Sequence, residues 1–271
     1  MLAMVISKIL NRVWAKLLRT CIRIIEPRSY ELAQVRHFGS EYGGKHFSTA
    51  DLNKDRILRI ISAGVGEDIS FDIDFLNHYS SRIIFVDPTP KSTIHMREVL
   101  SNIGNSRKVP YVNNGKQPVE SYELSTLERE RIQFLEVALW NKNESVTFYP
   151  PKNPEHVSYS VGNLQNNTKS ESLITVPAFT LRKVLQQAEL DSLDILKLDI
   201  EGAELEVLQE AFRDLIFPNQ IILEIDEFCF PSIRNLVRGF KVLTLLRKNG
   251  YRCAYNNQEY DYCFVHFPAK N

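Results

Sequence analysis

The feature that most constrains the fold is a regular alternation of β-branched and helical segments between residues 56 and 104. Residues 56–68 read as a buried strand that runs into a glycine turn, and residues 69–79 follow with apolar side chains at helical spacing. Residues 82–90 form a second short strand, and residues 91–104 form a helix that stops at glycine. Two strand–helix units with short connections indicate a parallel, doubly wound sheet.

The rest of the chain extends this α/β pattern. A third strand is expected within 132–140, and 144–151 and 172–181 are expected to form a side hairpin or sheet extension around the polar loop 153–171. Helices are predicted in 181–190 and 232–250, with strands ending near residues 199 and 226. The last two alternating segments, 251–257 and 260–267, predict an antiparallel strand pair at the sheet edge. We therefore expect one α/β domain over residues 31–271.

Residues 1–30 differ from this domain and predict a basic amphipathic helix. Lys8, Arg12, Lys16, Arg19 and Arg23 recur every three or four residues, so they share one helical face. Apolar residues, Trp14 among them, occupy much of the remainder. Three interpretations stay open: a helix packed on the domain, a helix in peripheral contact with an anionic membrane surface through residues 1–26, or a cleaved transit peptide.

Charge and cysteine content exclude several functional classes. The chain has 33 basic and 33 acidic side chains, so its zero net charge argues against nucleic acid as a partner. The four cysteines form no CxxC pair and no cluster with histidine, which predicts reduced thiols and no metal. No apolar run approaches the roughly 18 residues of a membrane span. We expect a cytoplasmic protein, on the inner membrane surface if the first helix binds lipid; the oligomeric state is not determined.

Polar residues follow the predicted strands at their carboxyl ends. In an open parallel sheet, ligands bind at these ends. Gly64 and Gly66 form a tight turn after the first strand. A dinucleotide site would carry a third glycine at residue 69, and Glu67 and Asp68 would repel a diphosphate but suit an ammonium group. Asp87 ends the second strand, where an acid can bind ribose hydroxyls; alternatively it only forms the turn before a proline. The combination favours an adenosyl ligand without a pyrophosphate.

A second charged cluster lies where a strand passes into a helix, in the stretch LDILKLDIEGAELEVL (193–208). Lys197, Asp199 and Glu201 alternate with apolar residues, so they share one face of the strand. That face is expected to open into a cleft, with Lys197 paired to an acid because a buried unpaired charge is costly. Glu204 and Glu206 are explained by their place in the first turn of the next helix.

These motifs together resemble the FkbM-type methyltransferases. The resemblance covers roughly residues 58–230 and is most specific in the Lys-x-Asp-x-Glu-Gly-x-Glu motif of 197–204. The glycine turn and FVDPTP (85–90) are similar to the cofactor-binding motifs of that family, although Ser62 stands where the family more often has an acid. The resemblance implies a class I methyltransferase fold, Rossmann-like, that uses S-adenosylmethionine to methylate a hydroxyl of a sugar, glycan or other small molecule.

The resemblance also implies roles for individual residues. Gly64, Gly66, Glu67 and Asp68 would contact the methionine end of the cofactor, Asp87 the ribose, and Ala138 and Leu139 the adenine. Asp199 and Glu201 would lie where acceptor and methyl group meet, with Lys197 holding Asp199 in its charged form. Asp199, Glu224 or His156 is the candidate base.

Two other functions remain open at this stage. A nicotinamide-dependent oxidoreductase would share the glycine turn and Asp87, but the chain lacks the third glycine and any Tyr-x-x-x-Lys pair. A noncatalytic adenosyl- or glycan-binding domain is the second. The acceptor is expected under the loops around 38–47 and 153–163, whose Tyr, His and Asn side chains suit a polyhydroxylated ligand.

Overall fold

A seven-stranded sheet forms the centre of the molecule in the computed structural model, in the order β11-β12-β10-β9-β3-β4-β5. The structure describes residues 14, 16–30, 34–50, 52–53, 55–149, 173–229 and 232–267. Within this part, neighbouring strands from β10 to β5 run parallel, and β12 is antiparallel to both of its neighbours. The predicted doubly wound, mostly parallel α/β fold is confirmed.

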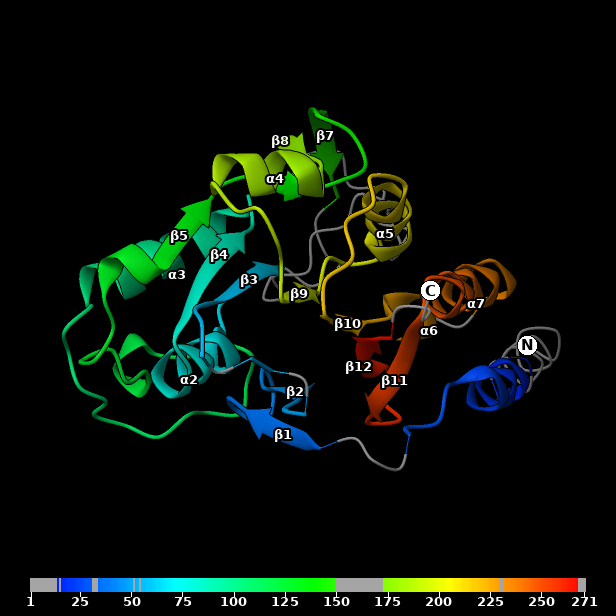
Figure 1. The fold of residues 1–271 in the computed structure, drawn as a ribbon, viewed down its shortest axis with the longest axis horizontal. Helices are drawn as coiled ribbons and strands as arrows, with labels where there is room; N and C mark the ends of the chain where they lie inside the picture. The colour runs from blue at the N-terminus through cyan, green and yellow to red at the C-terminus, as the bar shows by residue number, and fades with distance from the viewer. Residues whose placement is uncertain are drawn as a thin grey trace, which may run out of the picture.

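The alternating sequence pattern corresponds closely to the elements of this sheet (Figure 1). The parallel strands are β3 (Leu58–Ala63), β4 (Ser81–Val86), β5 (Ile132–Leu135), β9 (Ile195–Leu198) and β10 (Gln220–Glu224), joined by helices α2 (Ser70–His78), α3 (Pro90–Ser101), α4 (Leu181–Gln187), α5 (Glu204–Arg213) and two short 3-10 turns, η1 (Val119–Ser121) and η2 (Arg129–Arg131). The chain then continues through α6 (Asp226–Cys229) and α7 (Ile233–Lys248) to β11 (Tyr251–Asn256) and β12 (Asp261–His266).

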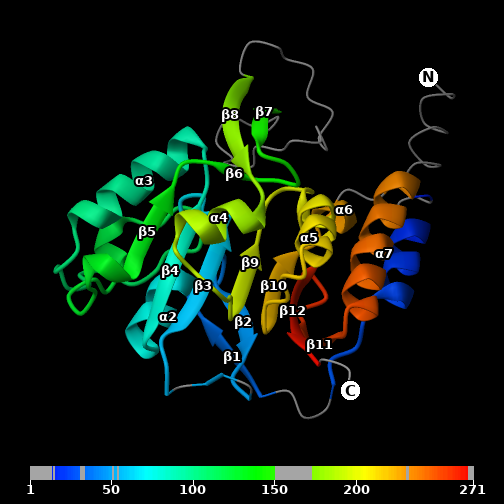
Figure 2. The ribbon, with the colours of Figure 1, turned by 45° about the horizontal axis from the view of Figure 1, so that its top comes forward.

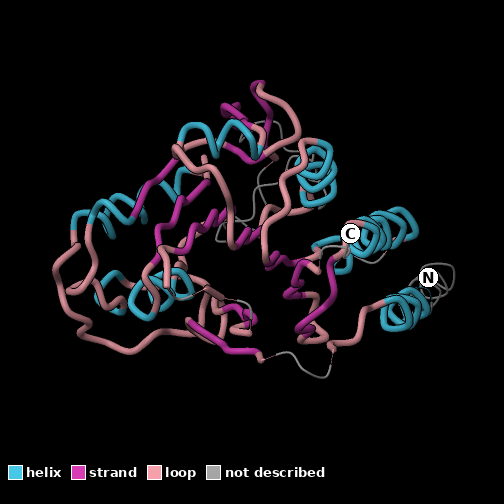
Figure 3. Tube along the Cα trace, in the orientation of Figure 1, coloured by secondary structure: helices cyan, strands magenta, loops and turns pink. Residues whose placement is uncertain are grey.

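The two faces of the sheet are buried under different helices, as the tube view also shows (Figure 3). Side chains alternate along each strand, so Ile61 and Leu196 face one core and Ile60 and Ile195 face the other. The first core is shared with α4, α5 and α7, and the second with α2 and α3. Burial on both faces explains why these strands read as nearly continuous apolar runs.

The segment 132–140, expected as one strand, forms two strands in different sheets. β5 ends at Leu135, where the carbonyl oxygen accepts a hydrogen bond from the amide of Val137 two residues later. After this tight turn, β6 (Ala138–Leu139) joins β8 (Ile174–Phe179) and β7 (Glu144–Phe148) in a three-stranded sheet. The expectation of a single strand was wrong because the alternation of apolar residues does not reveal a turn. The predicted side hairpin is confirmed.

A hairpin of β1 (Val35–Phe38) and β2 (Lys45–Ser48) lies over the second face of the sheet (Figure 2). From the sequence, only a turn was predicted in this segment. Phe47 is fully buried in the second core, and the side chain of Gln220 on β10 hydrogen-bonds both the amide and the carbonyl of Ser48. Tertiary contacts therefore fix the hairpin against the strand ends.

The last two strands form the predicted antiparallel edge pair, and a helix at residues 16–25 lies beside α7 in both ribbon views (Figures 1 and 2). Ile22 of this helix is buried in the first core, and Glu26 accepts a 2.6 Å hydrogen bond from the Tyr262 hydroxyl. Lys8 and Arg12 of the predicted basic face lie outside the described residues. No helix in the described part of the chain is both long and apolar enough to cross a membrane.

Candidate active site

One cavity of about 570 Å³ opens at the carboxyl ends of the parallel strands. It is lined by every site residue expected from the sequence within the described ranges. These residues come from the carboxyl ends of β3, β4, β9 and β10, from the turns that follow them, and from β6. These residues are Gly64, Gly66, Glu67, Asp68, Asp87, Ala138, Leu139, Lys197, Asp199, Glu201 and Glu224. His156, the third candidate base, lies outside the described residues.

The glycine turn packs directly on the backbone of the Lys-x-Asp motif. Gly64 has φ +78°, and a Cβ built there would lie 1.7 Å from the carbonyl oxygen of Asp199. Gly66 also has a positive φ, of +58°. Only glycine fits a left-handed position against another backbone, so the two motifs require each other locally.

Asp87 organises the glycine turn from the end of β4. One carboxylate oxygen accepts hydrogen bonds from the amides of Val65 (2.8 Å) and Gly66 (3.1 Å). The other accepts from the amide (2.8 Å) and the hydroxyl (2.7 Å) of Thr89. The two oxygens of a carboxylate together have about four acceptor positions, and these four hydrogen bonds occupy them. Asp87 therefore fixes the conformation of the turn as well as lining the cavity.

Glu67 and Asp68 line the cavity while holding neighbouring segments. Glu67 forms a 2.7 Å ion pair with the exposed Lys116. Asp68 accepts hydrogen bonds from the Ser40 hydroxyl at 2.7 Å and the Gln117 side-chain amide at 2.9 Å. The hairpin and the loop before η1 are thus tied to the start of α2 through one carboxylate.

Lys197 pairs with an acid that the sequence did not indicate. Its ammonium group lies 4.0 Å from a carboxylate oxygen of Asp72 on α2, and both side chains are almost fully buried. The same nitrogen donates to the Ser62 hydroxyl at 3.4 Å and the Gly64 carbonyl at 3.3 Å. Ser62, which stands where the resemblance led us to expect an acid, is therefore a hydrogen-bond partner of Lys197, and the acid is supplied by α2.

Asp199 has its closest cation in the hairpin. Lys45 on β2, whose side chain is only 5% exposed, lies 3.4 Å from Asp199, 3.8 Å from Glu224 and 2.6 Å from Asp261. Burial raises the pKa of Asp199, but the charges of Lys45 and then Lys197 outweigh it and leave that pKa below its usual value. The expected electrostatic support from Lys197 is thus present, but it is secondary to Lys45.

The pKa values of the neighbouring acids Glu224 and Asp226 shift in the opposite direction, upward. Burial, with the charges of Asp199 and other carboxylates, raises the pKa of Glu224 to about 7. Burial and the charge of Glu201 raise the pKa of Asp226 well above its usual range. Glu201 itself occupies a left-handed conformation, φ +55°, which is uncommon for a residue with a Cβ. The ends of β9 and β10 therefore gather more carboxyl groups than Lys45 can hold in the ionised form.

The two remaining acids of the motif have structural partners beyond the helix dipole. Glu204 is buried and accepts a hydrogen bond from the amide of Ile200 at 3.1 Å. Glu206 forms a bidentate pair with Arg238 of α7, at 2.8 and 2.9 Å. Arg238 also donates to the Gly202 carbonyl and to Glu227, so it clamps the motif turn onto α7.

Several cavity residues could not be assigned from the sequence. They come from the hairpin and from the chain after β10, and include His37, Tyr42, Lys45, His46, Asp226, Cys229 and Asp261. The turn signal in 38–47 and the acids after β10 were visible in the sequence. Nothing in the spacing showed that a lysine from residue 45 would reach Asp261, which lies 216 positions later.

The chain matches one family model and is similar to several solved structures. The family model of the methyltransferase FkbM domain matches residues 68–253. Among solved structures, cofactor-bound Rv0187 from MTB is 10% identical, with 79% of this chain and 73% of that chain covered and a TM-score of 0.41. Fibrillarin from Methanococcus jannaschii is 10% identical (79% and 68% covered, TM-score 0.38), and TrmN from Thermus thermophilus is 11% identical (79% and 46% covered, TM-score 0.34). No curated protein matches the sequence significantly.

The Rossmann-like sheet has its cavity at the carboxyl ends of the parallel strands, where open α/β sheets bind their ligands. The match over residues 68–253 spans most of the chain. The chain belongs to the FkbM methyltransferase family, as its motifs had indicated.

Proposed function

We propose that this protein transfers a methyl group from S-adenosylmethionine to a hydroxyl of a sugar, glycan or other small molecule. The observation that carries the proposal is the convergence of the glycine turn, Asp87 and the motif around Asp199 on one cavity. A cavity of about 570 Å³ lies within the range of roughly 300–1,000 Å³ that small-molecule sites occupy.

The residues at the glycine turn fit an adenosyl cofactor. Gly64 and Gly66 have backbone conformations that leave the strand end open to close approach. Asp68, whose partners Ser40 and Gln117 are neutral, gives the same edge a negative charge, which suits the ammonium group of a methionine end and opposes a diphosphate. Glu67 lies beside it, with its charge offset by Lys116. Ala138 and Leu139, both buried on β6, offer an apolar wall for a purine ring. When bound, the cofactor supplies an electrophilic methyl group on its sulfonium sulfur.

Asp199 is the best-placed base for the acceptor hydroxyl. Its carboxylate lines the cavity directly after β9, and the ion pair with Lys45 keeps it ionised and oriented. The positive charge of the buried Lys197 also stabilises the ionised form of Asp199, and its ammonium group donates a hydrogen bond to the Gly64 carbonyl. The contribution of these residues is alignment of the acceptor oxygen and removal of its proton.

Calorimetry distinguishes this proposal from its two rivals. We expect micromolar-range binding of S-adenosylmethionine and of its demethylated product, and no comparable binding of NAD. Binding of NAD alone would favour an oxidoreductase. Binding of the adenosyl ligands without methyl transfer to any acceptor would favour a noncatalytic domain.

Two isosteric variants separate binding from chemistry. Asp87→Asn keeps the shape of the residue but cannot accept hydrogen bonds at all four positions, so cofactor affinity should fall at least about tenfold. Asp199→Asn should retain cofactor affinity and lose most of the turnover. The exposed Asp191→Asn is the matched control. Full turnover in Asp199→Asn would exclude Asp199 as the base.

The hairpin suggests the acceptor class. His37, Tyr42 and His46 line the cavity, and the His46 ring stacks on Tyr255 with ring centroids 3.7 Å apart. Hydroxyl, imidazole and carboxylate groups around an open cavity suit a polyhydroxylated ligand. Screening sugars, sugar nucleotides and glycolipid precursors with a labelled methyl donor tests this. Methylation confined to acceptors without sugar hydroxyls would reject it.

A further inference from the structure

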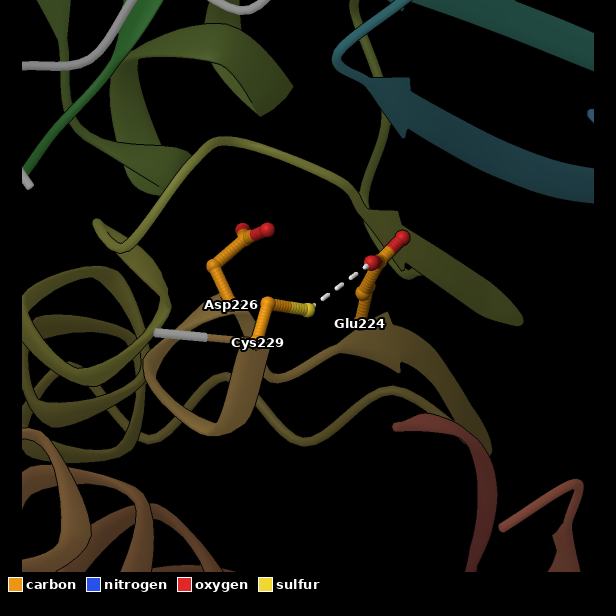
Figure 4. A group of neighbouring side chains, drawn as sticks. All are labelled: Glu224, Asp226 and Cys229. Atoms are coloured by element: carbon orange, nitrogen blue, oxygen red, sulfur yellow. Dashed lines mark hydrogen bonds between the residues drawn. The ribbon is translucent and has the colours of Figure 1, made fainter. Parts of the chain in front are cut away.

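We propose that Glu224, Asp226 and Cys229 bind a divalent metal ion of the zinc type at the wall of the cavity. The sequence indicated no metal, because its four cysteines form no CxxC pair and no cluster with histidine. The structure places one ligand atom of each within 4.8 Å of the other two (Figure 4).

The short helix α6 brings the three side chains together. Glu224 is the last residue of β10, and Asp226 and Cys229 are the first and last residues of α6. The Cys229 thiol donates to one carboxylate oxygen of Glu224 at 3.6 Å, and the Asp226 carboxylate extends toward the same space (Figure 4). A tetrahedral zinc ion with bonds of roughly 2.0–2.3 Å holds its ligand atoms about 3.5 Å apart, so small side-chain rotations would complete the set.

Asp226 is the independent sign that this cluster has a ligand. Its side chain is 5% exposed, and its buried oxygen Oδ2 has no hydrogen-bond partner in the described structure. A buried carboxylate oxygen without a partner destabilises the folded state, so native structures normally supply a hydrogen bond or an ion. The carboxylate nevertheless lines the cavity with Glu224 and Cys229 rather than turning into the protein.

Lys45 does not already serve as that counter-ion. Its ammonium group approaches the second oxygen of Glu224, Oε2, at 3.8 Å, while Oε1 is the atom that faces Cys229. The closest contact of Lys45 is to Asp261, which lies opposite Glu224 on the adjacent strand β12. Glu224 therefore lies between the ammonium group of Lys45 on one side and the proposed metal site with Asp226 and Cys229 on the other.

The donor set indicates the kind of metal. One thiolate with two carboxylates suits a borderline ion such as Zn²⁺ better than Mg²⁺ or Ca²⁺, which prefer oxygen ligands alone. Three protein ligands leave a fourth position open, as in catalytic zinc sites. If the proposed hydroxyl methylation is correct, this open position would take the acceptor oxygen and make its proton easier for Asp199 to remove.

Metal titration of the chelator-treated, full-length protein tests the site directly. We expect one Zn²⁺ per chain by calorimetry, and with Co²⁺ as the probe a thiolate-to-cobalt absorption band in the near ultraviolet. Cys229→Ser should abolish the band. Asp226→Asn should weaken Zn²⁺ binding at least about tenfold, because mutation of residues that only hydrogen-bond to metal ligands already lowers metal affinity by that factor. Cys21→Ser, at a cysteine of similar partial exposure, is the matched control and should change neither.

Thermal unfolding distinguishes loss of the metal site from poor folding of a variant. Zn²⁺ should raise the unfolding midpoint of the wild-type protein and raise those of Cys229→Ser and Asp226→Asn less at the same Zn²⁺ concentration, since stabilisation of the folded state falls with affinity. A cobalt band that survives Cys229→Ser, an Asp226→Asn variant with wild-type affinity, or no binding in the micromolar range would each overturn the site. Calorimetry with S-adenosylmethionine on the same sample tests the proposed function separately. Metal binding without cofactor binding would reject the proposed methyltransferase function and leave the metal site intact.

Discussion

Gly64 and Asp199 are in contact through their backbones, and this contact joins the two motifs that define the cavity. A side chain at Gly64 would overlap the Asp199 carbonyl oxygen, at 1.7 Å. The consequence is that the glycine turn and the Lys-x-Asp strand end cannot be altered independently. The substitutions below test this arrangement and the electrostatics around it.

Gly64→Ala should be far more damaging than an equivalent change elsewhere. The added methyl group must displace the strand end, so we expect a loss of roughly 4 kcal/mol or more in unfolding free energy, above the usual range for single substitutions. Gly104→Ala is the matched control, because Gly104 has a similar positive φ of +96° but nothing within 4 Å of its Cβ position. Urea denaturation of both variants measures the difference. Equal losses would mean that backbone conformation alone, and not the contact, is responsible.

Lys45→Met should raise the pKa of Asp199. Lys45 is the main group that lowers this pKa against the effect of burial, so without it burial prevails. The titration of Asp199, followed by NMR of the carboxyl carbon, should move upward by at least about one pH unit. Lys116→Met, at an exposed lysine that pairs with Glu67, is the control and should leave Asp199 unchanged. An unchanged titration in Lys45→Met would show that Lys197 alone suffices.

Arg238→Met should destabilise the motif turn. The substitution leaves the buried Glu227 without its cation and removes the donor to the Gly202 carbonyl, and breaking such a buried pair typically costs about 3–5 kcal/mol. Arg97→Met breaks an exposed ion pair with Glu136 and should cost no more than about 1 kcal/mol. Chemical denaturation of the two variants compares them. A similar small loss in both would contradict the clamp.

His95 should make the protein less stable in acid. It is buried, and burial lowers its pKa to about 4, while its ring bonds the Tyr122 hydroxyl at 2.9 Å. The unfolded chain takes up a proton near pH 6.5 and the folded chain does not, so stability is lost as the pH falls from about 6.5 to about 4. Between about pH 7.5 and about pH 4.5 this one group contributes a loss of roughly 2.5 kcal/mol.

The variant His95→Gln isolates this contribution. Glutamine can still hydrogen-bond Tyr122 but takes up no proton, so the acid-dependent loss should shrink by roughly the amount above. His78→Gln, at an exposed position, should keep the wild-type dependence. Denaturant titrations at the two pH values give the comparison, and identical pH dependence in all three proteins would rule out His95 as the cause.

The helix at residues 16–25 remains a candidate for membrane contact, and point variants test it better than truncation. Trp14, Leu17 and Ile24 are more than half exposed, whereas Ile22 belongs to the core and would be lost with the segment. The triple variant Trp14→Ala/Leu17→Ala/Ile24→Ala should co-sediment less with anionic vesicles than the wild-type chain. The same triple change on the exposed residues Ile57, Ile94 and Leu215 is the control. Equal sedimentation would leave packing on α7 as the role of this helix.

The order and type of most elements could be predicted from local pattern. The β-branched runs at 58–63 and 81–86 and the helical spacing between them required only the periodicity of apolar residues. The place of the candidate site followed as well, because polar residues after buried strands must meet at one edge of a parallel sheet. The split of 132–140 and the hairpin at 35–48 were not predictable in this way, since a tight turn and a docked hairpin have no periodic signature.

The sequence by itself placed Lys197, Asp199 and Glu201 at one site and Gly64 and Asp87 at neighbouring strand ends, and all five line the cavity. The predicted common strand face was wrong for Asp199 and Glu201, because β9 ends at Leu198 and Glu201 has a left-handed turn conformation. Only the tertiary structure decided the partners of these charges. Lys197 is paired with Asp72 rather than Asp199, and Asp199 with Lys45, because helix α2 and the hairpin are folded over the same face. The physical reason is that strand alternation is local, whereas the pairing of buried charges depends on which distant segments exclude water from them.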